Sequence, residues 1–279
     1  MTLPYRKHFH TMALLFQQSA SLKGIPSLFT LHFSLYQGGG HVDVFRRREL
    51  KFLLDEGQRK ALEALMEARM VPDKYGRKTI CNLYYDTDDF RLIRHSLEKP
   101  VYKEKLRLRS YGRIGPGVDM FLEMKKKYKG IVYKRRIAVT QEQAFAFMER
   151  RSPLPKDCQI GRELRYFRDL YGSLSPKVYI SYERLAWFDP NDGGFRVTLD
   201  WDVEYRTKDL DLYLPTGGKK ILEPGQSLLE VKASGGIPLW MSKFLSEQGL
   251  SQQSFSKYGR AYQELLLEEL KESRGSRYA

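Results

Sequence analysis

The segment KEKLRLRSYG, residues 103–112, decides the fold, because a basic residue stands at every second position over most of its length. Side chains two apart on a β-strand share a face. The segment therefore predicts a strand whose one face is built from four cations: Lys103, Lys105, Arg107 and Arg109. The opposite face carries Leu106 and Leu108, which suit packing against a core.

The next two predicted strands repeat this pattern. Residues 118–128 place Glu123, Lys125 and Lys127 on one face, and residues 131–140 place Lys134 and Arg136 on one face. Between residues 101 and 136 there are twelve cations and three carboxylates. Cations at this density repel one another unless a polyanion fills the space between them. The pattern favours an inward-facing phosphate-binding channel over the other interpretation, a solvated outer face of charges.

The rest of the chain predicts further strands at 44–53, 78–85, 177–188, 195–205 and 228–233. Helices are expected at 55–70, 86–97, 141–150, 159–172, 238–248 and 257–272. Short connections between strands predict antiparallel pairing, so the expected fold class is α+β: an antiparallel β-barrel tunnel with flanking helices. We expect a poorly ordered leader over 1–41, the tunnel domain over 42–272, and a tail over 273–279.

Composition limits the classes of function. The net charge of +14 favours polyanionic partners. Two isolated cysteines form neither a zinc motif nor a disulfide framework, which fits a reducing compartment and predicts a cytoplasmic protein. The sequence shows no transmembrane run, no GxxxxGK[ST] loop and no protein-kinase motif set. It leaves the oligomeric state open.

Carboxylates also occur among these cations. A carboxylate in such surroundings either pairs with a cation or holds Mg²⁺ or Mn²⁺, which prefer oxygen ligands and bridge phosphates. Glu230, in the segment LLEVK, is the preferred candidate for a metal ligand. Glu49 and Glu123 are weaker candidates, which we expect to orient neighbouring cations.

Nine motifs in order resemble the catalytic domain of the vacuolar transporter chaperone (VTC) family, within the CYTH-like triphosphate tunnel metalloenzymes. The resemblance covers about residues 42–265. The motifs are RRRELKF (46–52), YYDTDDF (84–90), KEKLRLRSYG (103–112), FLEMKKK (121–127), YKRR (133–136), SYERLAWF (181–188), FRVTLD (195–200), LLEVK (228–232) and SFSKY (254–258).

The resemblance implies a polyphosphate polymerase that transfers the γ-phosphate of ATP to a growing inorganic polyphosphate chain, with Mn²⁺ or Mg²⁺. It implies that the metal is coordinated by Glu230. Catalytic cations lining the tunnel would be Lys51, Arg107, Arg109, Lys125, Lys134, Arg184 and Lys232. Substrate-binding residues would be Lys105, Glu123, Arg136, Tyr182, Arg196, Ser256 and Lys257, of which the last two close one mouth of the tunnel.

Three other functions remain open. One is a tunnel triphosphatase that hydrolyses ATP or tripolyphosphate. Relatives of that branch begin with Glu-x-Glu-x-Lys, whereas this chain has Arg47 at the first Glu position, which favours the polymerase. Another is a non-catalytic polyphosphate-binding module, which would need no metal ligand. Nucleic-acid binding is disfavoured, because the cations alternate with residues expected to pack outward.

Overall fold

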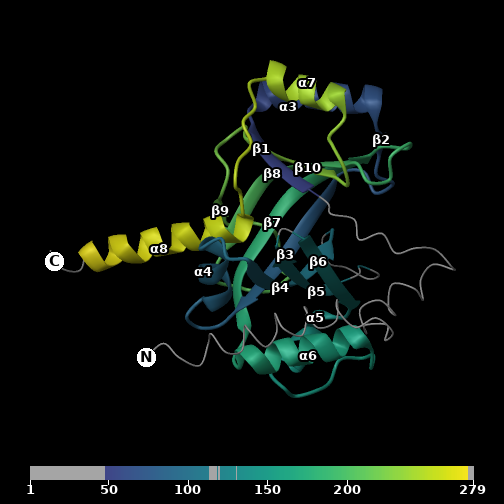
Figure 1. The fold of residues 1–279 in the computed structure, drawn as a ribbon. Helices are drawn as coiled ribbons and strands as arrows, with labels where there is room; N and C mark the ends of the chain where they lie inside the picture. Colours follow the sequence, from purple (N-terminus) through teal and green to yellow (C-terminus); the bar gives the residue numbers. More distant parts are fainter. Residues whose placement is uncertain (1–47, 113–117, 119, 130, 276–279) are drawn as a thin grey trace. The chain divides into compact units, whose positions relative to one another are not determined.

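Among the residues that can be described, one antiparallel sheet of ten strands forms the centre of the computed structural model (Figure 1). The structure describes residues 48–112, 118, 120–129 and 131–275. The strands are β1 (Arg48–Leu54), β2 (Val71–Pro72), β3 (Lys78–Asp86), β4 (Tyr102–Tyr111), β5 (Met120–Tyr128), β6 (Ile131–Ala138), β7 (Ser175–Phe188), β8 (Arg196–Arg206), β9 (Lys219–Lys220) and β10 (Ser227–Ala233). The helices are α3 (Glu56–Arg69), α4 (Arg91–Leu97), α5 (Gln141–Met148), α6 (Gln159–Tyr171), α7 (Leu239–Glu247) and α8 (Lys257–Gly275).

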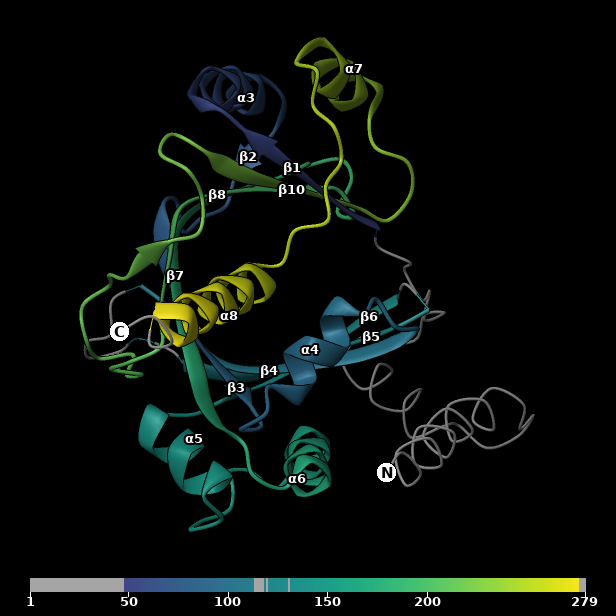
Figure 2. The same cartoon turned by 90° about the vertical axis from the view of Figure 1, so that its left-hand side faces the viewer.

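The strand order is β1-β10-β8-β7-β3-β4-β5-β6, with β2 beside β7 and β9 beside β8. Figure 2 shows the sheet curling, so that β1 and β10 lie opposite β5 and β6. Within the described residues, no ladder of backbone hydrogen bonds joins β6 to β1. Side chains approach across this opening, since Lys125 Nζ lies 3.6 Å from Glu49 Oε2. The expected α+β antiparallel fold is confirmed, with a strongly curled sheet that is not closed by backbone pairing.

Helices α3 and α7 cover the outer face of β1, β8 and β10 (Figure 1). Asp55 begins α3 through a capping box: its Oδ1 accepts a hydrogen bond from the Gln58 backbone N–H at 2.8 Å, and Gln58 Oε1 accepts from the Asp55 N–H at 2.9 Å. The helix then buries Leu62 and Met66 against the sheet. This packing fixes the strands that carry Glu49 and Glu230.

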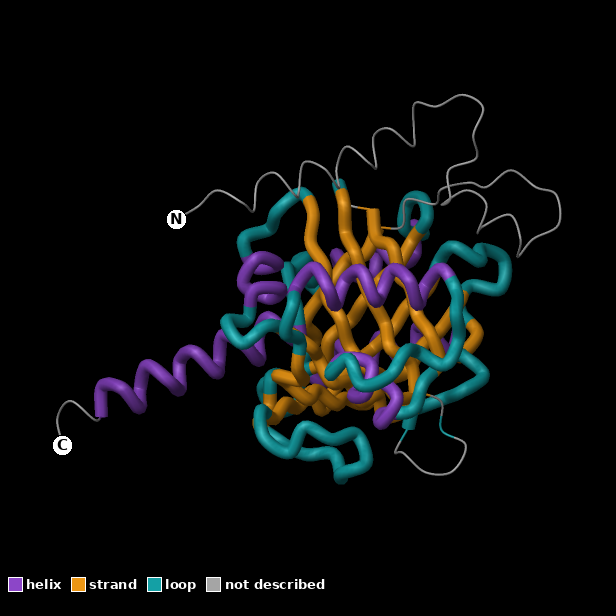
Figure 3. The backbone as a smooth tube through the Cα atoms, turned by 90° about the horizontal axis from the view of Figure 1, so that it is seen from below, coloured by secondary structure: helices purple, strands orange, loops and turns teal. Residues whose placement is uncertain are grey.

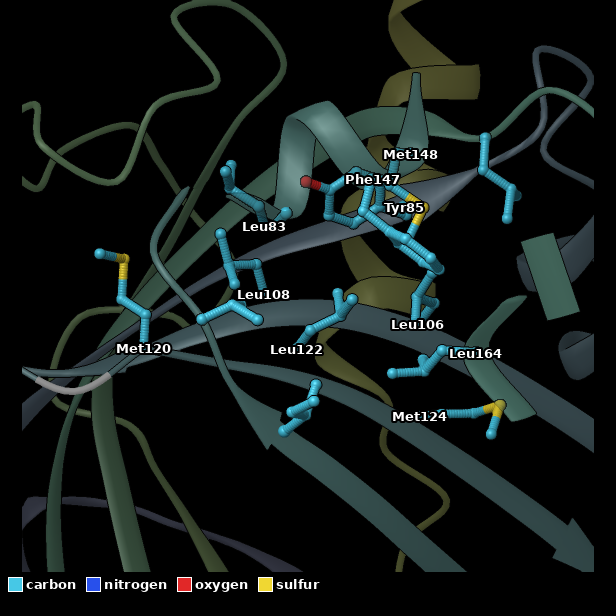
Figure 4. Packing of buried hydrophobic residues seen from close by; sticks show 14 of the residues in the cluster. Leu83, Tyr85, Leu106, Leu108, Met120, Leu122, Met124, Phe147, Met148 and Leu164 are labelled. Carbon is cyan, nitrogen blue, oxygen red and sulfur yellow. The ribbon is translucent and has the colours of Figure 1, made fainter. Parts of the chain in front are cut away.

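Helices α5 and α6 cover the outer face of the strands β3 to β6. Leu106 and Leu108 of β4 are buried there, with Phe147 of α5 and Leu164 of α6 (Figure 4). Burying each leucine side chain contributes about 1.5–3 kcal/mol. Because successive side chains alternate in direction, this packing turns the cations of β4 to the inner face, as the sequence predicts.

Helices α4 and α8 pack on the inner side of β3 and β7. The Tyr258 ring of α8 stacks on the Tyr84 ring of β3 with centroids 4.7 Å apart. Tyr258 also donates its hydroxyl proton to Asp86 Oδ2 at 2.9 Å, and Asp86 accepts two backbone N–H groups from the first turn of α4. These contacts position Ser256 and Lys257, immediately before Tyr258, over the inner face of the sheet.

The element boundaries differ from those expected at a few places. Helix α8 continues to Gly275 instead of ending at residue 272, and Figure 3 shows it extending away from the strands. The two-residue strands β2 and β9 are too short to produce a periodic signal. The expected leader (1–41) and Arg47 lie outside the described residues. Within the described part, no helix is long and apolar enough to cross a membrane.

Candidate functional site

The inner face of the curled sheet carries a dense set of charges, which we call the charged interior. Arg109 and three of its carboxylates are buried, with Asp200 at 0%, Glu123 at 1% and Glu230 at 7% exposure, whereas Glu49 is half-buried. It consists of nine cations, Lys51, Lys105, Arg107, Arg109, Lys125, Lys134, Arg184, Lys232 and Lys257, and four carboxylates, Glu49, Glu123, Asp200 and Glu230. Positive charge is therefore in excess on the inner face of the sheet.

Four cations from four different elements surround Glu230. Its Oε1 lies 3.3 Å from Lys51 Nζ and 3.7 Å from Lys257 Nζ. Its Oε2 lies 2.9 Å from Lys232 Nζ and 3.8 Å from an Arg184 nitrogen. The β1–β10 register creates the first of these contacts, because Lys51 is the cross-strand partner of Glu230.

These cations keep Glu230 ionised. Burial alone would raise the pKa of its carboxyl, but the attraction of the four cations, led by Lys232, outweighs burial and holds the pKa well below its ordinary value. Glu49 behaves in the same way: burial opposes ionisation, yet Lys125 and its other cationic neighbours lower its pKa to about 2. Both groups are therefore fixed anions at neutral pH.

Asp200 of β8 is a second centre of the charged interior. Arg184 donates to both of its carboxylate oxygens, at 2.6 Å each, and Lys257 Nζ lies 2.5 Å from Oδ2. Cross-strand pairing places Arg184 opposite Asp200. Burial raises the pKa of Asp200, but the two cations more than offset that effect and lower it.

Glu123 of β5 is the third centre. Arg107 donates two hydrogen bonds to Glu123 Oε2, at 3.0 and 2.8 Å, and Lys134 Nζ lies 2.6 Å from Oε1. Arg109 approaches to 3.8 Å. Burial raises the pKa of Glu123, yet these cations together lower it to about 2. Glu123 thus orients three cations from β4 and β6. Because it carries a single negative charge, the four groups together keep a net positive charge.

Tyr182 joins the β4 side of the charged interior to the β7–β8 side. Its hydroxyl accepts a hydrogen bond from an Arg109 nitrogen at 3.1 Å. The ammonium of Lys257 lies 4.4 Å from the centroid of its ring, and the guanidinium carbon of Arg184 lies 5.2 Å from it. Cations over an aromatic face are stabilised by its quadrupole. Tyr182 therefore positions three cations without neutralising them.

One row of the inner face consists of lysines alone. Lys105, Lys125 and Lys134 are direct cross-strand neighbours on β4, β5 and β6. Lys105 donates to Ser256 Oγ at 2.8 Å. Its ammonium has no carboxylate within ion-pair distance among the described residues. Burial and then the nearby lysines, first Lys125, lower its pKa to about 7.

Two predicted binding residues lie away from this network. Arg196 shares the inner side of β8 with Asp200, but it stands at the start of the strand, is half exposed, and forms an ion pair with Asp73 at 2.5 Å. Arg136 is the cross-strand partner of Glu123, yet its side chain is exposed and lies over the Phe121 ring at 4.5 Å. The other predicted site residues all belong to the charged interior or contact it.

Sequence reasoning missed Asp200, which is the most buried carboxylate of the charged interior. The alternation Arg196-x-Thr198-x-Asp200 in FRVTLD was the available signal, because it places Asp200 on the same face as the cations of neighbouring strands. Tyr84 was also missed as a site residue. Its hydroxyl accepts a hydrogen bond from Arg107 at 3.1 Å, and nothing in the local pattern of its motif, YYDTDDF, indicates that contact.

The fit of a divalent metal depends on Glu230. Within the described residues, no three His, Cys, Asp or Glu side chains gather to hold a metal ion. Mg²⁺ at phosphates commonly takes one or two carboxylates, with phosphate oxygens and water as its other ligands. The site fits a metal only when phosphate is bound: Glu230 would supply one protein ligand, and a bound phosphate chain would supply others.

The charged interior suits electrostatic chemistry on phosphates. Both cysteines lie elsewhere, since Cys81 is buried in the core beneath α5 and α6 and Cys158 packs against it. Ser256 Oγ is already bonded to Lys105 and to the Gly259 N–H. Phosphoryl transfer needs chiefly positioning and charge neutralisation, and the cations of this region provide both.

Comparison with known proteins identifies one family. The model of the VTC domain matches residues 46–266. None of the curated proteins matches the chain.

Solved structures that the chain resembles distantly include a candidate adenylate cyclase from Bacillus halodurans, with 15% identity, a TM-score of 0.47, and coverage of 77% of this chain and 94% of that one. A protein from Pyrococcus horikoshii OT3 has 16% identity, a TM-score of 0.42, and coverage of 80% and 99%. A Mimivirus capping enzyme triphosphatase has 8% identity, a TM-score of 0.33, and coverage of 72% and 88%. The family match, and not these distant likenesses, carries the assignment.

Proposed function

The chain belongs to the VTC domain family, and on that premise we propose that it is a polyphosphate polymerase. It transfers the γ-phosphate of ATP to the end of an inorganic polyphosphate chain held in the charged interior, and it releases ADP. Both substrates are polyanions, as the net charge of +14 favours.

The row Lys105, Lys125 and Lys134 is the observation that carries this proposal. Like charges directly opposite one another on neighbouring strands are destabilising. Burial and the surrounding cations lower the pKa of Lys105 to about 7. In the protein without substrate, the protonated form of this lysine is therefore destabilised. A phosphate chain along the row would remove the repulsion, and this destabilisation supports a binding role over a structural one.

The transfer step follows from the same charges. A terminal oxygen of the acceptor chain attacks the γ-phosphorus of ATP, a new P–O bond forms, and the bond from the γ-phosphorus to the bridging oxygen breaks to release ADP. We propose that Arg107, Arg109 and Arg184 bind the phosphates, because guanidinium groups contact phosphate oxygens in a bidentate manner. Lys257 and Lys51 neutralise charge that develops on the leaving and attacking oxygens.

A divalent metal completes the site in this proposal. Glu230 would hold Mn²⁺ or Mg²⁺ together with phosphate oxygens. When bound, the ion supplies Lewis-acid neutralisation of phosphate charge. The lysines now paired with Glu230 would then be available to the phosphates.

Hydrolysis of the triphosphate is the competing reaction. Water needs a base to become a good nucleophile, whereas a phosphate oxygen is already an anion. Glu49 and Glu123 have pKa values lowered to about 2, and that of Glu230 is also far below its ordinary range. Such weak bases favour the polymerase over a triphosphatase.

The test is a product analysis. The protein is incubated with ATP and Mn²⁺ or Mg²⁺, phosphates are resolved by size, and ADP and free phosphate are measured. We expect ADP, a ladder of long acid-labile chains, and little free phosphate. Free phosphate in proportion to ADP would identify a triphosphatase instead. Binding of added polyphosphate without turnover would identify a binding module.

A further inference from the structure

A second set of lysines continues the charged interior toward one end of the β4–β5 pair. Lys103 and Lys127 are direct cross-strand partners, one pair beyond Lys105 and Lys125. Because positions two apart on a strand share a face, the new pair lies on the same side of the sheet as the charged interior. Lys99 stands in the turn between α4 and β4.

None of these three lysines has a carboxylate partner among the described residues. Lys103 Nζ donates to the backbone carbonyl of Ser96 at 3.2 Å. Burial, and then the charges of Lys127 and Lys99, lower the pKa of Lys103, in keeping with the position of Lys127 directly across the ladder from it. Lys99 and Lys127 are exposed, so this cluster faces solvent where the charged interior ends.

The two ends of β4 differ in chemistry. Toward its C-terminal end, Arg107 is paired with Glu123, and Arg109 bonds to Asn82 and Tyr182. Toward its N-terminal end, Lys103 and Lys105 face only other lysines across the ladder. Guanidinium groups in fixed hydrogen bonds suit a phosphate held in one position, whereas lysine ammonium groups act as mobile point charges. The lysine end therefore suits a chain that must slide.

We propose that Lys99, Lys103 and Lys127 form an exit subsite, which guides the growing polyphosphate chain out of the charged interior at the α4–β4 end. The inference rests on the proposed function and adds to it the end of the sheet at which the product chain leaves. From Lys103 to Arg109 the strand spans about 20 Å at ~3.4 Å per residue. A long chain therefore reaches the exit subsite when its end lies at Arg109, and tripolyphosphate does not.

The experiment compares the affinity of the unliganded protein for long-chain polyphosphate and for tripolyphosphate, without ATP. In the variant K103Q/K127Q, we expect the affinity for long chains to fall about tenfold, equivalent to ~1.4 kcal/mol. Affinity for tripolyphosphate stays unchanged. The slope of log affinity against log salt becomes shallower by about one to two, because two phosphate contacts are lost. With ATP present, the variant releases shorter products.

The matched control is K219Q/K243Q, which removes two exposed lysines paired with Glu268 and Glu247. An equal loss in this control, or an equal loss for tripolyphosphate in K103Q/K127Q, overturns the exit subsite. It is also overturned if single-stranded nucleic acid binds the wild type as tightly as long polyphosphate and is weakened equally by K103Q/K127Q. Because binding is measured without turnover, failure of the polymerase assay and failure of this inference are separate results.

Discussion

Lys257, the first residue of α8, forms an ion pair with Asp200 of β8 at 2.5 Å, and both groups are almost completely buried. The same carboxylate receives two hydrogen bonds from Arg184. The residues on either side of Lys257 are also engaged, since Ser256 accepts from Lys105 and Tyr258 donates to Asp86. Three consecutive residues thus tie the start of α8 to β8, β4 and the end of β3.

Removing either cation from Asp200 should have unequal effects on folding. R184M leaves a fully buried carboxylate with one partner, and we expect it to lower the free energy of unfolding by about 3 kcal/mol. K257M leaves the bidentate arginine in place and should cost about 1 kcal/mol. Urea denaturation of both variants measures the difference. Equal losses would show that Lys257 supports Asp200 as much as Arg184 does.

Glu230 should affect metal dependence more than polyphosphate binding. In E230Q we expect the metal concentration for half-maximal turnover to rise at least about tenfold, because a carboxylate ligand is lost. Polyphosphate affinity should hold or increase, since one negative charge is removed. The matched control is E49Q, which alters the neighbouring carboxylate and should leave the metal response unchanged. An unaltered metal titration in E230Q would exclude Glu230 as a ligand.

Lys105 should couple anion binding to proton uptake. Its pKa of about 7 lies below the ordinary 10.5, so the unfolded chain binds a proton more tightly than the folded one. The lysine's contribution to stability therefore increases as the pH rises from about 7 to 10.5. A bound polyanion favours the charged form, so affinity for tripolyphosphate should decrease as the pH rises above about 7. Titration calorimetry in two buffers of different ionisation enthalpy counts the protons.

The control for this effect is K105M, in which the uptake assigned to Lys105 should disappear. The remaining pH dependence is that of the ligand and of other groups. If K105M takes up as many protons as the wild type, the titrating group lies elsewhere.

Glu123 should contribute stability that is lost in acid. Its folded-state pKa of about 2 lies below the ordinary 4.5, so the contribution is present above about 4.5 and is lost as the pH falls to about 2. E123Q should be less stable than the wild type by about 3 kcal/mol at neutral pH, because the largely buried Arg107 and Arg109 and the more exposed Lys134 lose their charged partner. Urea midpoints between pH 6 and pH 2 should converge for the two proteins; a constant gap would contradict the assignment.

The alternation of residues 103–109 was sufficient to predict two sides of the sheet. Only one strand face could accept Leu106 and Leu108 beneath α5 and α6, so the four basic residues had to point inward. The period of two makes such a prediction robust, since a shift by one residue would bury the charges in the core.

The partners of those charges could not be predicted from the sequence. The sequence placed Glu49, Glu123 and Glu230 among the cations, but it did not show which cations each carboxylate contacts, and it did not single out Asp200. Some of these pairs, such as Lys51 with Glu230, depend on register between strands far apart in the chain. Others join consecutive strands, but the β7–β8 register includes an irregularity between Ser181 and Glu183. Local pattern contains no information on such offsets.

Arg196 shows the same limit at a strand end. Alternation places it on the inner side with Asp200, but its contact is with Asp73, in the loop after β2. Because β2 has only two residues, no periodicity indicated where that loop would lie. The sequence predicted on which side of the sheet Arg196 lies, but it could not predict which residue outside the strand Arg196 contacts.

The pairing of β1 with β10 also determines when the fold can be completed. Lys51 and Glu230 meet in this ladder, one near the beginning of the described chain and the other near its end. During synthesis β1 emerges long before its ladder partner β10, and its apolar residues Phe52 and Leu54 are fully covered only once β10 and α7 have joined α3 on that face. Such distant contacts slow folding and prolong exposure to aggregation. The register that brings Glu230 beside Lys51 therefore makes a late step of folding a condition for assembling the site.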